Sequence, residues 1–242
     1  MGFSSEDLSG KELIGCDFSG QDLSEADLSE SDLSEANLQG TRFCRSSLYR
    51  TRLRGARMQG ADFSEANLTE ANVSEASLKG AVFRSADLEG ADLRRSDLSE
   101  TNFEGSNLTG GYLGEALLTG AQMKDAEMKA ADLNQANLAG ANLVGVDFRY
   151  SKMNGSILND ADLTESDFTG ATLVGATFLQ ANLKGADFTE ADLGGADFSL
   201  ALNMTCEQIE SAYFDKESTL FPGYIQIRWL SETEYECQCS PA

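Results

Sequence analysis

Large apolar residues recur at every fifth position of the chain from Phe3 to Phe198, without a single insertion. These 40 positions hold 24 Leu, 11 Phe, 4 Met and Val73. The position two residues earlier is usually small, and 23 of its 40 occurrences are Ala. A period of five fits neither the 3.6-residue helix nor the two-residue strand. It predicts a solenoid in which each short side turns one large and one small residue inward.

The remaining positions of each repeat predict how the sides are joined. Gly is frequent two residues after the large apolar residue, where a corner with positive φ costs it little. Asp or Asn usually stands directly before the large apolar residue, as in ADFSEANLTEAN over residues 61–72. These side chains are too numerous to be catalytic. We expect them to hydrogen-bond to neighbouring backbone near the corners.

The phenylalanines indicate how many sides make one coil. With four sides, residues 20 apart stack, which gives two aromatic columns. The columns are Phe43, Phe63, Phe83 and Phe103, and Phe148, Phe168 and Phe188. Three sides would place Phe43 over Met58 and so break the columns. Because stacked aromatic pairs add about 0.5–1.5 kcal/mol beyond burial, the sequence favours four sides.

Residues 3–201 resemble the pentapeptide-repeat proteins, most clearly in ADLSESDLSEANLQG (residues 26–40) and ANLKGADFTEADLGGADFS (residues 181–199). The resemblance implies an all-β fold, a right-handed quadrilateral parallel β-helix of about ten coils. Residues 205–225 also resemble the C-terminal extension of cyanobacterial and other bacterial members. We expect a pentapeptide-repeat β-helix over 1–201, a helix and strand cap over 202–230, and an acidic, disordered tail over 231–242.

The two ends of the solenoid are predicted to differ. Thr205 followed by Gln208 is a capping-box pattern and predicts a short C-terminal α-helical cap over 206–213, which would bury the open core of the last coil. Residues 224–230 alternate as a strand does. Phe3 is already in register with the repeat, so we expect the N-terminal coil to present an open, unpaired edge. A homodimer through the N-terminal coil is therefore expected as one mode of association.

Composition excludes several functions. The chain has no histidine, which rules out imidazole catalysis and His-ligated zinc. Its formal charge of −22 argues against direct nucleic-acid binding, and no apolar run predicts membrane insertion. Five cysteines fit a reducing compartment, although Cys237 and Cys239 could bind a soft metal or form a disulfide. We expect a cytoplasmic protein that is no enzyme and needs no cofactor.

Two charged surfaces are candidate interaction sites. Residues 41–60 contain six arginines and no acid. In a four-sided coil most of them lie 20 residues from an acid, which predicts charge relief between coils. Arg54 and Arg57 have no acid at that spacing and are the better functional candidates.

The second surface is acidic: residues 1–40 hold ten acids against Lys11 alone. The candidate acids are Asp22, Glu25, Asp27, Glu30, Asp32 and Glu35. An acidic rod could imitate DNA, and the resemblance supplies a precedent, because some pentapeptide-repeat proteins bind DNA gyrase in this way. The leading hypothesis is a non-catalytic protein-binding or scaffold solenoid of unknown partner. The alternative is a DNA-mimicking regulator of a DNA-binding enzyme such as DNA gyrase.

Overall fold

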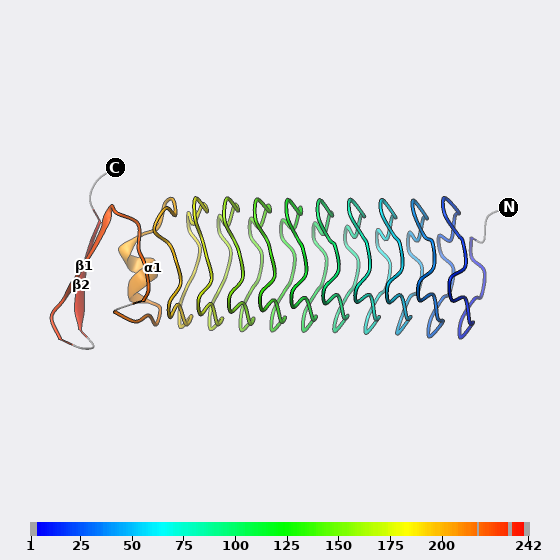
Figure 1. Cartoon of the computed structure of the whole chain (residues 1–242), viewed down its shortest axis with the longest axis horizontal. Coiled ribbons are helices and arrows are strands. Elements are labelled where there is room, and N and C mark those ends of the chain that lie inside the picture. The colour runs from blue at the N-terminus through cyan, green and yellow to red at the C-terminus, as the bar shows by residue number, and fades with distance from the viewer. Residues whose placement is uncertain (1–3, 217, 232–233, 240–242) are drawn as a thin grey trace.

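A computed structural model describes residues 4–216, 218–231 and 234–239. Parallel β-bridges join residues 20 apart in an unbroken series, from Asp7 with Asp27 to Asn182 with Leu202. The chain therefore winds as a four-sided parallel β-helix with one bridge on each side of each coil. Figure 1 shows the resulting straight rod, with the N-terminus at one end and a separate cap at the other. The predicted quadrilateral β-helix is confirmed.

The core is a single apolar column enclosed by the four sides. Every large apolar repeat position from Leu23 to Phe198 is fully buried. The rings of Phe43 and Phe63 stack with centroids 4.8 Å apart, and those of Phe148 and Phe168 with centroids 5.0 Å apart. These distances match the spacing of neighbouring strands, so both predicted aromatic columns are confirmed.

Each corner is a tight turn with one left-handed residue. In a typical corner the Ala26 N–H donates to the Leu23 carbonyl at 3.1 Å, and Glu25 has φ 61°. A positive φ at the third residue fits a type II turn. Every fifth residue from Ser5 to Gly195 has φ between 52° and 69°, whether or not it is Gly. The ladder hydrogen bonds on both sides of each corner impose this conformation on the other residue types.

The Asp and Asn side chains hold these corners. The Ser24 N–H donates to Asp22 Oδ1 at 3.0 Å, and the Thr69 N–H donates to Asn67 Oδ1 at 2.9 Å. The same contact, two residues along the chain, recurs through the coils up to Asp197. The predicted backbone role of these residues is confirmed.

The cap continues the ladder irregularly. Helix α1 (Cys206–Glu210) has Thr205 as its N-cap in a complete capping box with Gln208. The helix is shorter than the predicted 206–213, because the chain leaves it to pair with the last coil. Tyr213 forms a parallel bridge with Asp192, and Leu220 forms one with Asp197. On the side that α1 covers, the buried Gln208 amide donates to the carbonyls of Leu183 and Ala186 at 2.8 and 2.7 Å.

A β-hairpin closes the end of the rod. Strands β1 (Ile225–Trp229) and β2 (Tyr235–Cys239) are antiparallel and lie outside α1 in Figure 1. The expectation of a disordered tail over 231–242 is therefore wrong for the segment 235–239, whereas residues 232–233 and 240–242 lie outside the described part of the chain. Apolar packing and a covalent link order this strand: Tyr235 contacts Phe214, and Cys237 forms a disulfide with Cys206.

The disulfide corrects the expectation that the cysteines are reduced. The structure pairs Cys237 with Cys206, a partner that the expectation for Cys237 and Cys239 did not include. Cys16 and Cys44 remain free thiols. No helix in the described part of the chain has the length and apolarity that crossing a membrane requires.

Candidate interaction surfaces

Six arginines encircle one coil of the rod. We call Arg42, Arg45, Arg50, Arg52, Arg54 and Arg57 the arginine belt. Of these, Arg42, Arg52 and Arg57 lie at bridge positions on three sides of the coil, and Arg45 and Arg50 lie at corners with positive φ. Their distribution over three sides and the corners argues against one compact basic patch.

Acids of the two neighbouring coils pair with most of the belt. Three contacts reach the preceding coil and two reach the following one. These are Arg42–Asp22 (3.6 Å), Arg45–Glu25 (2.9 Å), Arg52–Asp32 (2.8 Å), Arg50–Glu70 (2.7 Å) and Arg54–Glu75 (3.0 Å). All are at least partly exposed, so each is worth only about 0–1 kcal/mol. Their main effect is to separate like charges that would otherwise stack between coils.

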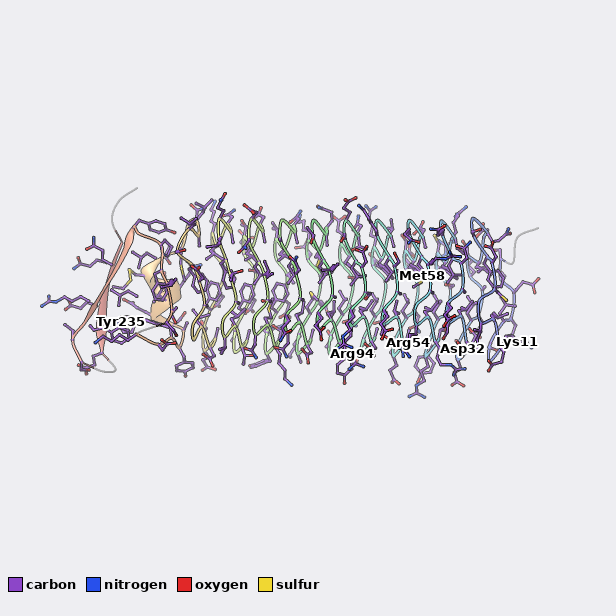
Figure 2. All side chains as sticks on the ribbon, in the orientation of Figure 1. Lys11, Asp32, Arg54, Met58, Arg94 and Tyr235 are labelled. Carbon is purple, nitrogen blue, oxygen red and sulfur yellow. A yellow bond between two sulfur atoms is a disulfide. The ribbon has the colours of Figure 1, made fainter. Side chains whose placement is uncertain are left out.

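The two arginines that the sequence singled out behave differently. Arg54 pairs with Glu75, which lies 21 residues away, diagonally across a corner. A separation of 20 reaches only the position directly above or below, so the sequence pattern does not reveal this partner. Figure 2 shows Asp32, Arg54 and Arg94 along one side of the rod. Arg57 is exposed and makes no salt bridge to any residue that the structure describes.

The structure divides the acidic candidates into two groups. Asp22, Glu25 and Asp32 form ion pairs with the belt. Hydrogen bonds from Ser34, followed by Arg52, lower the pKa of Asp32 despite some desolvation. In the second group, Asp27 accepts a hydrogen bond from the Ser29 N–H, and Glu30 and Glu35 are corner residues with positive φ. The six candidate acids therefore do not come together at one site.

Arg57 belongs to a straight row of outward residues on one side of the rod. The Arg57 row comprises Asp17, Asn37, Arg57, Ser77, Asp97, Leu117, Asn137, Ile157, Thr177 and Asp197, joined by successive bridges. Two of its members are exposed apolar residues, Leu117 (47%) and Ile157 (36%). The row contains three acids, whereas the opposite row, from Asp7 to Asp187, contains seven. The sequence alone could have revealed this row, because Leu117 and Ile157 stand at repeat positions that usually hold Asp or Asn.

Next to Arg57, side-chain amides form a hydrogen-bonded chain along a corner. The Gln39 amide donates to Gln59 Oε1 at 2.9 Å, and the Gln59 amide donates to Ser77 Oγ at 2.6 Å. These hydrogen-bonded groups are neutral, and the nearest carboxylate of the row with an electrostatic effect is Asp17, two coils away, whose pKa is lowered by hydrogen bonds from Ser19 and Asn37 and by the charge of Arg57. Elsewhere, the described residues contain no group of three or more side chains able to hold a metal ion.

Comparison with known proteins identifies the family. The sequence model of the family described as pentapeptide repeats matches this chain in eight copies, between residues 12 and 199. The chain belongs to the pentapeptide repeat family. Among solved structures it is similar to HetL, a pentapeptide repeat protein involved in heterocyst differentiation regulation from the cyanobacterium Nostoc sp. strain PCC 7120. The identity is 31%, over 76% of this chain and 91% of that one, with a TM-score of 0.36.

Two further solved structures are similar at lower sequence identity. QnrB1, a plasmid-mediated fluoroquinolone resistance protein, is 17% identical over 78% of this chain and 90% of its own, with a TM-score of 0.43. A pentapeptide repeat protein of the Arabidopsis thaliana thylakoid lumen is 27% identical over 59% and 71%, with a TM-score of 0.19. Comparison with curated protein sequences gives no match.

Proposed function

We propose that this pentapeptide repeat protein is a non-catalytic scaffold that binds another protein through the Arg57 row. The observation that carries the proposal is the combination, on one straight side of the rod, of an exposed Arg57 without an ion-pair partner among the described residues and the exposed Leu117 and Ile157. At the centres of protein interfaces, arginine is enriched, whereas Lys, Glu and Asp are depleted.

The backbone makes this side a rigid platform. Neighbouring members of the row are held by parallel ladder hydrogen bonds, such as Leu118 N–H to the Asn137 carbonyl at 2.7 Å. The inward neighbours Leu118 and Leu158 are fully buried, which fixes the side from below. A partner therefore meets side chains whose spacing is set before binding, and preorganisation lowers the entropic cost of association.

Site-specific photo-crosslinking tests this proposal. A photoreactive phenylalanine analogue replaces Leu117 in the full chain, and the same analogue replaces Val82, on another side, as the control. In a lysate of the source cells, we expect a discrete crosslinked protein from position 117 only. The variant Arg57→Glu should abolish this product, whereas Lys124→Glu, at a corner not adjacent to the row, should preserve it. Equal crosslinking from both positions, or insensitivity to Arg57→Glu, would reject the proposal.

DNA mimicry is the competing function, and three ion pairs count against it. Asp22, Glu25 and Asp32, in the most acidic coil, are neutralised by arginines of the belt, so fewer free carboxylates stand where phosphates would be. A gyrase supercoiling assay with the purified protein separates the two functions. Inhibition that disappears on replacing Asp27, Glu30 and Glu35 by their amides would favour mimicry over the scaffold.

A further inference from the structure

A bare corner near the C-terminal cap opens a groove in the surface of the rod. Gly155, Gly175 and Gly195 occupy successive positions of one corner, where earlier coils carry Glu75, Arg95 and Glu115. Gly194 adds a second missing side chain beside Gly195. The result is a hollow of ≈ 500 Å³ lined by Gly175, Gly194 and Gly195, by Val174 and Asp192, and by residues of the cap.

Two carboxylates and an apolar side chain border the space above Gly194. A Cβ at Gly194 would lie 3.3 Å from Asp192 Oδ1, 3.6 Å from Asp215 Oδ2 and 3.9 Å from Val174 Cγ2. Backbone donors hold both carboxylates in place: the Gly194 N–H donates to Asp192 at 3.1 Å, and the Gly195 N–H donates to Asp215 at 3.0 Å. The acidic groups are therefore fixed on two sides of the hollow.

Aromatic rings extend the groove along the cap. Tyr213, which is 65% exposed, and Phe214 line both this hollow and an adjoining one of ≈ 420 Å³. The second hollow also contains Trp229 and Tyr235, and Figure 2 shows Tyr235 within the cap. There the ammonium group of Lys216 lies 5.7 Å from the centroid of the Trp229 ring. This contact shows that the aromatic side of the groove accommodates a cationic group.

We propose that this groove binds a basic peptide segment of a partner protein. An Arg or Lys side chain of the segment places its cationic group between Asp192 and Asp215 above Gly194. Its methylene stem lies along Val174 and Tyr213, and a neighbouring apolar residue fills the aromatic hollow. Charge complementarity selects this occupant: residues 201–242 carry seven acids against Lys216 and Arg228. Partial desolvation by apolar walls strengthens such a cation contact.

The site is independent of the Arg57 row, so the two proposals can fail separately. Trp229 is the only tryptophan of the chain and lines the groove, which makes its fluorescence a direct reporter. The probe is the blocked pentapeptide Ala-Leu-Arg-Leu-Ala, titrated into the full-length protein. Its control carries citrulline, a neutral isostere, in place of the arginine.

We expect saturable binding of the arginine peptide, weakened at least tenfold by citrulline and by the variant Asp192→Asn. The matched control Asp132→Asn should leave binding unchanged, because Asp132 makes the same turn contact, to the Asn134 N–H at 3.1 Å, three coils away. If Asp192→Asn lowers the thermal stability, Gly194→Leu provides a second variant, which fills the hollow without a positive φ. Arg57→Glu should not affect the titration.

Three results would overturn the proposal. The first is the absence of saturable binding by the arginine peptide. The second is equal affinity for the citrulline peptide, which would make the groove a purely apolar site. The third is a peptide affinity that survives both Asp192→Asn and Gly194→Leu, because binding would then occur elsewhere on the rod.

Discussion

Corner residues carry backbone strain at the scale of single residues. Ala130 and Tyr150 adopt φ 56° and 60°, in a region that costs an L-residue about 1–2 kcal/mol. Gly pays no such cost, which explains its frequency at the corners. The ladder hydrogen bonds impose the same conformation where Glu, Arg or Ala stands in place of Gly. The fold therefore tolerates these residues at the corners, although Gly would be more stable there.

Replacing Ala130 by Gly should stabilise the protein. The change relieves the left-handed strain, and the greater freedom of Gly in the unfolded chain offsets part of that gain. We expect a net increase of about 0.5–1 kcal/mol, measured as a higher urea midpoint. Ala126→Gly is the matched control: Ala126 is buried, has no positive φ, and should lose a similar amount. A lower midpoint for Ala130→Gly would show that the corner is unstrained.

Acidification should destabilise the fold. Hydrogen bonds and the charge of Arg149 lower the pKa of Asp147, and hydrogen bonds from Arg95 lower the pKa of Glu115. A carboxyl whose pKa is lower in the folded chain stabilises it above its unfolded pKa, about 3.9 for Asp and 4.3 for Glu. That contribution is lost as the pH falls through the folded pKa. The melting temperature should therefore decrease between pH 5 and pH 2, and an increase would contradict this.

The cap is the element whose stability depends most on covalent chemistry. Its hairpin is held to α1 by the Cys206–Cys237 disulfide. Trp229 and Tyr235 of the hairpin also pack with Phe214, which follows α1, with ring centroids 5.0–5.7 Å apart. Two strands alone are marginal in water. The cross-link and the aromatic cluster together compensate for the lack of a larger sheet.

Replacing both Cys206 and Cys237 by Ser should loosen the hairpin and leave the coils folded. Removing a cross-link that closes a loop of about 30 residues costs on the order of 3–4 kcal/mol in the chain-entropy treatment. Hydrogen exchange should become faster in β1 and stay slow in the coils up to Phe198. The Cys16→Ser variant is the control, because that thiol is free. Unchanged exchange in β1 would show that the aromatic contacts suffice.

At the scale of the whole molecule, we expect the cap to protect the open end of the core. Deleting residues 202–242 would expose the large residues of the last coil, Leu183, Phe188, Leu193 and Phe198, all now fully buried. Exposed apolar surfaces of this kind drive association, so the truncated rod should oligomerise or aggregate in light scattering. A soluble monomer would show that the tail is no cap.

Deleting residues 1–21 is the comparison at the other end. Leu8 and Leu13 are already partly exposed there, so the loss of one coil should be tolerated. The homodimer through the N-terminal coil stays a prediction, and this deletion tests it. A dimeric parent protein that becomes a folded monomer would support the homodimer, and an unchanged oligomeric state would contradict it.

The sequence by itself determined the solenoid because its contacts have one fixed separation. Every residue of a coil meets the residue 20 positions away, so a local period of five and two phenylalanine columns were enough to predict the four sides and the core. Only the tertiary structure decided the remaining features. The Arg54–Glu75 pair crosses a corner at a separation of 21, Gln208 reaches Leu183 at 25, and Cys206 meets Cys237 at 31. No repeat encodes these separations. The first follows from the diagonal approach of two side chains across a corner, and the other two follow from how the irregular cap folds and packs on the last coil. The packing of the cap also forms the groove beside Gly194 that we propose as a binding site.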